Sequence, residues 1–120
     1  DLRRLNFSTT PYSVTPCPLP AAVAAVRDSA YYEANCARIA AERERFAAAL
    51  RQRGWYLTDS KANFVLAKPG AGSAPDIAAK LKERGILVRY LGGELAEYLR
   101  ITIGAAGQMD ALLAALDEIA

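Results

Sequence analysis

The sequence has no histidine and only two cysteines in its 120 residues. Without histidine, it lacks the side chain that most often acts as a general base near neutral pH. Cys17 and Cys36 stand far apart, without the spacing of metal ligands, so we expect no metal site. We interpret both as reduced thiols of a cytoplasmic protein and assign them no further role.

Long apolar runs and an excess of one charge are also missing. No run approaches the roughly 18 apolar residues of a membrane-spanning helix. The net charge is +2, and acidic and basic residues are mixed along the chain rather than gathered in a basic stripe. We therefore expect neither a membrane nor a nucleic acid as partner. The balance of 52% hydrophobic and 23% charged residues is typical of one ordinary globular domain.

The first twenty residues differ in character from the rest. They show no clear period and contain Pro11, Pro16, Pro18 and Pro20. Proline favours extended backbone and cannot donate to a sheet. We expect residues 1–20 to be an extended connector from a large domain that this sequence lacks, and residues 21–120 to form a domain of their own. On this interpretation the sequence is a piece of a longer protein.

The remaining sequence predicts helices alternating with pairs of strands. A long Ala-rich helix is expected over about 21–53, bent near 28–32 and stopped by Gly54, with an apolar stripe from Val23 onward and residues 42–45 mostly as a solvated face. Strands are expected at 55–58, 63–68, 86–90 and 97–103, with a helix from a Ser73 cap to about 84. The last helix has a core-facing stripe of Met109, Leu112, Leu113, Leu116 and Ile119. The predicted fold class is α+β (an α/β sandwich): a short, mostly antiparallel sheet covered by helices.

One arginine interrupts the last predicted strand. Leu99, Ile101 and Ile103 alternate with Arg100 and Thr102, so the aliphatic and polar side chains lie on opposite faces. A guanidinium on a half-buried strand is unfavourable unless an anion meets it, and its planar donors suit a carboxylate or phosphate. The anion is either a ligand or an acidic residue of the chain itself, and the strand alone leaves both open.

Several strings together resemble the small C-terminal domain of fold-type I pyridoxal-phosphate (PLP) aminotransferases, and within them the histidinol-phosphate aminotransferase family. They occur in family order and cover essentially the whole chain: Pro11-Tyr12-Ser13-Val14, Glu42-Arg43-Glu44-Arg45, Ser60-Lys61-Ala62-Asn63-Phe64-Val65-Leu66, Gly85-Ile86-Leu87-Val88-Arg89 and Tyr98-Leu99-Arg100-Ile101-Thr102-Ile103-Gly104.

The resemblance implies roles for particular residues. Arg100 would bind the anionic end of the substrate, and Arg89 would be a second anion contact. Tyr12 would reach across a homodimer interface toward the substrate phosphate of the neighbouring subunit, although Ser13 departs from the family's Pro-Tyr-Asn-Val. Asn63 begins the strand that lines the family's site, and we favour a structural role for it.

The resemblance also implies PLP in the full-length parent, but not in this piece. Ser60-Lys61-Ala62 looks like the string around the family's Schiff-base lysine, yet no Gly-x-Arg-x-Gly segment follows it. We therefore expect Lys61 to be a surface lysine, and we assign no catalytic or cofactor-binding residue. The piece should be inactive alone and should contribute substrate recognition and closure over the cofactor.

The implied reaction is transamination between histidinol phosphate and 2-oxoglutarate in histidine biosynthesis. A threonine-phosphate decarboxylase is an alternative, since that related group shares the domain and also recognises a phosphorylated substrate. A second alternative is a stand-alone regulatory α+β module that binds small anions without chemistry.

Overall fold

The computed structural model describes residues 18–119, which divide into two units, one ending at Asn35 and the other beginning at Cys36. The first unit contains helix α2 (Leu19–Arg27) and the first residues of α3 (Ser29–Gln52). Asp28 separates the two helices with a non-helical φ of −96° and ψ of 57°, which confirms the predicted bend.

Two expectations for this unit are wrong. Helix α2 begins at Leu19 and so takes in the last two residues of the predicted connector, because Pro20 lies in the first helical turn, where proline is tolerated. The apolar stripe was expected to start at Val23, but Val23 and Val26 are exposed and α2 contains no buried residue. The buried stripe of the long helical region belongs to the later part of α3.

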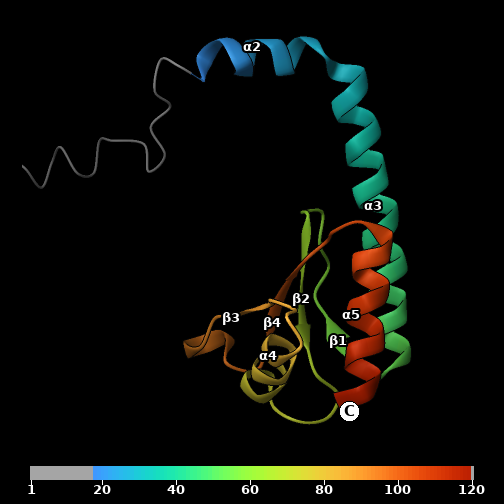
Figure 1. Ribbon diagram of the computed structural model, residues 1–120, viewed down its shortest axis with the longest axis vertical. Coiled ribbons are helices and arrows are strands. Elements are labelled where there is room, and N and C mark those ends of the chain that lie inside the picture. The colour runs from blue at the N-terminus through green and yellow to red at the C-terminus, as the bar shows by residue number, and fades with distance from the viewer. Residues whose placement is uncertain (1–17, 120) are drawn as a thin grey trace, which may run out of the picture. The chain divides into compact units, whose positions relative to one another are not determined.

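The second unit is built on a four-stranded antiparallel sheet (Figure 1). Its strands are β1 (Tyr56–Leu57), β2 (Phe64–Lys68), β3 (Arg89–Tyr90) and β4 (Leu99–Thr102), in the order β1-β2-β4-β3. A short 3-10 helix, η1 (Gly93–Leu95), lies between β3 and β4. This architecture confirms the predicted α+β class.

The strands are shorter than predicted, and β3 keeps only two of its five predicted residues. Residues 86–88 do not pair in the sheet, and the N–H of Ile86 donates instead to the carbonyl of Leu81, 2.9 Å away, at the end of helix α4 (Ala74–Glu83). The same carbonyl accepts from the N–H of Arg84 at 3.0 Å, so both bonds belong to the cap at the C-terminus of the helix. The N–H of Ile86 is therefore engaged at the end of α4 and is not available to pair within a longer β3.

Helices α3, α4 and α5 (Ala106–Ile119) pack on one face of the sheet. That face carries Val65 and Ala67 of β2 and Leu99 and Ile101 of β4. The helices add most of the remaining core: Phe46, Ala47, Leu50, Ala74, Ile77, Leu81, Met109, Leu112, Leu113, Ala115 and Leu116, with Leu57 and Ile103 completing it. The core-facing stripe predicted for α5 is confirmed, with Ile119 partly buried at its end. In Figure 1, the later part of α3 lies beside α5, and Arg45 forms an ion pair with Asp110 across them.

Local signals at the helix ends are also confirmed. The hydroxyl of Ser73 accepts a hydrogen bond from the N–H of Asp76 at 3.4 Å and donates to the Asp76 carboxylate at 2.6 Å, which caps α4. Gly54 has a φ of +78°, the left-handed conformation expected of a glycine that stops a helix.

The expectation that residues 42–45 form a mostly solvated face is wrong for Arg43, which is buried. It is 7% exposed, although its neighbours Glu44 and Arg45 are exposed as predicted. Its Nη1 donates to the carbonyl of Ala62 at 3.0 Å, and its Nη2 donates to the Glu44 carboxylate at 3.0 Å. A buried guanidinium is tolerated where its donors are paired. Arg43 therefore joins α3 to the loop that precedes β2.

Candidate functional site

The sheet has an open face, turned away from the three helices. We define it by the residues that alternate with the buried ones: Tyr56, Phe64, Leu66, Lys68, Arg89, Arg100 and Thr102. Arg100 and Thr102 lie on this face while Leu99 and Ile101 are buried on the other, as the alternation predicted. The two arginines singled out from the sequence therefore share one surface.

The strand register brings these arginines directly opposite each other. Arg100 is paired with Leu66 on β2 and with Arg89 on β3. Residues opposite each other in an antiparallel pair have Cβ atoms about 4.5–5.5 Å apart, and like charges in that position destabilise a sheet. Within residues 18–119, neither guanidinium belongs to any ion pair. The described part of the chain thus supplies no acidic residue to neutralise this concentration of positive charge.

Arg100 rests on an aromatic ring. Its Cζ lies 5.2 Å from the centroid of the Phe64 ring, within the range of a cation–π contact. Its Nε is shielded from solvent and finds no hydrogen-bond partner in the part of the chain that the structure describes. A shielded N–H without an acceptor is unfavourable by about 1–3 kcal/mol. The Arg100 side chain thus contacts the Phe64 ring while one of its own N–H donors lacks an acceptor in the described part of the chain.

Phe64 was missed as a site residue in the sequence. Its contact with Arg100 depends on the pairing of β2 with β4, which joins residues 36 positions apart in the chain, and no local pattern gives that register. Arg43 was missed as a buried residue, but here a signal existed. It lies four residues after Ile39 and three before Phe46, so it continues the helical stripe that leads into the core.

The loop before Phe64 is fixed by its own hydrogen bonds. The hydroxyl of Ser60 donates to the carbonyl of Phe64 at 2.6 Å and accepts from the N–H of Ala62 at 3.1 Å. Asn63 has an exposed side chain, and its carbonyl accepts from the N–H of Ile103 at 2.8 Å. Lys61 is exposed in this loop, as expected of a surface lysine.

Other predicted features have simpler outcomes. Tyr12 and Cys17 lie outside the described residues, and Cys36 is a free, exposed thiol. No group of three or more potential metal ligands occurs in residues 18–119. No helix there is long and apolar enough to cross a membrane.

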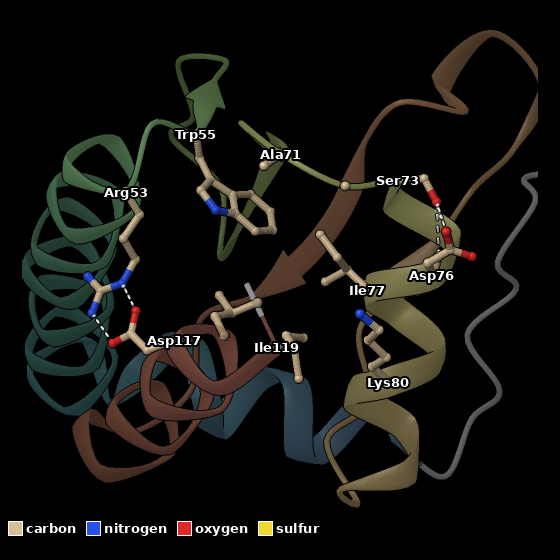
Figure 2. Close-up of a pocket in the computed structure, with 11 residues that line it drawn as sticks. Arg53, Trp55, Ala71, Ser73, Asp76, Ile77, Lys80, Asp117 and Ile119 are labelled. Carbon is tan, nitrogen blue, oxygen red and sulfur yellow. Dashed lines mark hydrogen bonds and ion pairs between the residues drawn. The ribbon is translucent and has the colours of Figure 1, made fainter.

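A cavity of about 190 Å³ lies within the helical layer (Figure 2). The apolar side chains of Trp55, Ile77 and Ile119 line it, and the paired Arg53 and Asp117 form part of its rim. The Arg53 guanidinium donates to both Asp117 oxygens, at 2.6 and 2.7 Å, and these hydrogen bonds lower the pKa of the Asp117 carboxyl. None of the residues that line this cavity belongs to the open face, so it is separate from the paired arginines.

Comparison with known proteins identifies the family of this chain. The family model for aminotransferases of class I and II matches residues 2–119. The chain is 37% identical over 119 residues to histidinol-phosphate aminotransferase 2 of Rhizobium meliloti, covering 98% of this chain and 34% of that protein.

Two solved structures extend the comparison. The structure of histidinol-phosphate aminotransferase from Sinorhizobium meliloti in complex with pyridoxal-5'-phosphate aligns with a TM-score of 0.75 and 32% identity, over 82% of this chain and 28% of that one. L-threonine-O-3-phosphate decarboxylase from Porphyromonas gingivalis aligns with a TM-score of 0.59 and 25% identity, over 65% of this chain and 26% of that one.

The chain belongs to the class I and II aminotransferase family. It spans about a third of the length of the curated relatives that it matches.

Proposed function

We propose that this chain recognises the anionic end of the substrate in a PLP-dependent aminotransferase and helps to close the active site over it. The observation that carries the proposal is the register of Arg89 and Arg100, which are directly opposite on the open face and have no acidic partner in residues 18–119. An anion that both guanidinium groups contact would remove their repulsion and give charge-assisted hydrogen bonds. The open face of the sheet is then the surface that meets the substrate.

We propose histidinol phosphate as the substrate, with 2-oxoglutarate as amino acceptor in histidine biosynthesis. The similarity to histidinol-phosphate aminotransferases supports this choice over a threonine-phosphate decarboxylase, since the decarboxylase aligns over less of the chain with a lower TM-score. Both substrates carry a phosphate, so the paired arginines alone do not distinguish them.

The described residues do not fit PLP itself. Lys61 is exposed in the loop before β2, and Lys68 forms an ion pair with Glu97 at 2.6 Å. We propose that the lysine that binds the cofactor lies in a large domain beyond this sequence, and that the chain is inactive alone. Tyr12, contributed across a homodimer interface to the neighbouring subunit's substrate, remains part of the proposal, as does a cytoplasmic location.

The first experiment measures inorganic phosphate and histidinol phosphate binding by calorimetry in the full-length protein that contains this chain. Arg100→Lys keeps the charge but loses the planar pair of donors, so we expect the dissociation constant to rise about 10- to 150-fold, which corresponds to the 1.5–3 kcal/mol of a charge-assisted hydrogen bond. Arg53→Lys is the matched control, since Arg53 is engaged by Asp117 away from the open face. Unchanged affinity in Arg100→Lys would contradict the proposal.

A second experiment addresses the cofactor. The 120-residue chain is titrated with PLP while the imine absorption is followed, and borohydride then traps any adduct. We expect no stoichiometric adduct, because the described part of the chain offers no buried lysine beside the open face. An adduct at Lys61 would show that the chain carries its own cofactor chemistry. Tight binding of small anions by the chain alone, without a large domain, would instead favour the stand-alone regulatory module.

A further inference from the structure

We propose that Phe64 is a positioning residue for Arg100: contact with its ring fixes where the guanidinium lies on the open face and leaves its outer nitrogens to meet the substrate anion. The inference rests on the proposed function of Arg100 and adds a residue to it. The geometry that supports it is the 5.2 Å distance between the Arg100 Cζ and the Phe64 ring centroid.

The strand register explains why Phe64 reaches Arg100. Phe64 is paired with Thr102, and Arg100 is the next residue of β4 on the same face. Such diagonal neighbours are within reach when one side chain is aromatic and the other is long. Directly across from Arg100 on β2 stands Leu66, which offers apolar contact but no π-face. The ring of Phe64 is thus the feature of β2 that can orient a planar cation.

A contact with an aromatic ring suits an arginine that must bind an anion. A cation–π contact uses the charge of the guanidinium and leaves its N–H groups available, whereas an ion pair would occupy those donors. The Nε of Arg100 is shielded and unpaired within residues 18–119, which leaves the two Nη atoms as the donors for a ligand. Restricting the long side chain before binding also lowers the entropy lost when the anion arrives.

The backbone under Phe64 is held independently of its ring. Ser60 donates to the Phe64 carbonyl, and the neighbouring Asn63 carbonyl accepts from Ile103. The Phe64 side chain is only half-buried and is not a member of the core. Replacing the ring should therefore change the orientation of Arg100 without dismantling the loop or the sheet.

The test compares Phe64→Leu, Phe64→Met and Phe64→Tyr in the full-length protein, with inorganic phosphate binding measured by calorimetry and KM and kcat measured for histidinol phosphate. Leu and Met keep an apolar side chain but remove the ring, and we expect both to raise the phosphate dissociation constant and KM about 3- to 30-fold. Phe64→Tyr keeps an aromatic ring, so its phosphate affinity should stay close to that of the original protein. Tyr90→Leu is the matched control, because it removes an exposed ring from the opposite face of the sheet, where Tyr90 is paired with Leu99.

A double-mutant cycle separates positioning from a general structural effect. If Phe64 acts through Arg100, then adding Phe64→Leu to Arg100→Ala should cause no further loss of phosphate affinity. The inference would be overturned if the double variant lost phosphate affinity by the sum of the two single losses. It would also be overturned if Phe64→Tyr bound phosphate as weakly as Phe64→Leu. The two proposals fail differently. Unchanged phosphate binding in Arg100→Ala would refute the proposed function. If Arg100→Ala bound phosphate more weakly but Phe64→Leu bound it as the original protein does, only the role of Phe64 would be refuted.

Discussion

Replacement of Arg43 tests whether a single buried arginine or an exposed ion-pair network does more to stabilise this domain. Arg43 is 7% exposed and donates to the carbonyl of Ala62. Arg45 makes two ion pairs, with Glu42 at 2.5 Å and Asp110 at 2.7 Å, but its side chain is 45% exposed. Exposed ion pairs are screened by solvent and contribute little. We therefore expect Arg43→Ala to be the more destabilising change, although Arg45 has more ionic partners.

The magnitude follows from what each variant removes at position 43. Arg43→Ala removes two buried methylenes, worth about 0.8 kcal/mol each, and leaves the Ala62 carbonyl without its charged donor, worth about 1.5–3 kcal/mol. Folding of the variant no longer removes a charged guanidinium from water, which offsets part of this, so we expect a loss of about 2–4 kcal/mol in the free energy of unfolding. Arg43→Met retains an apolar stem and loses mainly the hydrogen bond, so its loss should be about 1–2 kcal/mol.

Urea unfolding followed by the fluorescence of Trp55, the one tryptophan of the sequence, measures these differences. We expect the original protein to be the most stable, Arg43→Met to be less stable and Arg43→Ala the least stable of the three. Arg45→Ala should also be more stable than Arg43→Ala. The reasoning is refuted if Arg45→Ala is as destabilising as Arg43→Ala, because the surface network would then outweigh the buried contact.

Two further predictions use the same unfolding assay. Gly70→Ala should lower stability by about 1–3 kcal/mol, because a Cβ at this position would run into the backbone carbonyl of Gly54 rather than a movable side chain, and an unchanged midpoint would contradict that close approach. Asp117→Asn should weaken the pH dependence of stability below about pH 4: the hydrogen bond from Arg53 lowers the folded-state pKa of Asp117 below its ordinary value of 3.8, so this pair stabilises the fold above that pH and the stabilisation is lost as pH falls through the lowered pKa. Equal acid sensitivity of the original protein and Asp117→Asn would contradict this assignment.

Local sequence signals predicted much of the helical layer. The helical stripe from Met109 to Leu116 is buried, the Ser73 cap and the Gly54 stop occur at the expected residues, and the bend falls at Asp28. Each of these features depends on residues within a few positions of one another, where periodicity and backbone preference act directly.

The arrangement of the open face could be predicted only in part. Alternation around Arg100 correctly separated it from Leu99 and Ile101. Placing Arg89 opposite Arg100, and Phe64 beside it, requires the order and register of β2, β3 and β4. Strand register depends on which hydrophobic faces meet across the whole sheet and on how the intervening loops are built, so a local pattern does not determine it.

The pairing of Arg89 with Arg100 places two like charges opposite each other, which is energetically unfavourable for the sheet. Among the described strand pairs, the others join apolar residues or an apolar residue with a polar one, and none joins two like charges. Natural sequences are locally consistent with their folds, and departures concentrate where function requires them. On the same arginine, the Nε is shielded from solvent and has no hydrogen-bond partner among residues 18–119. On the proposed function, an anion that bridges the two guanidinium groups would turn their repulsion into attraction, so the arrangement that destabilises the sheet alone would favour ligand binding.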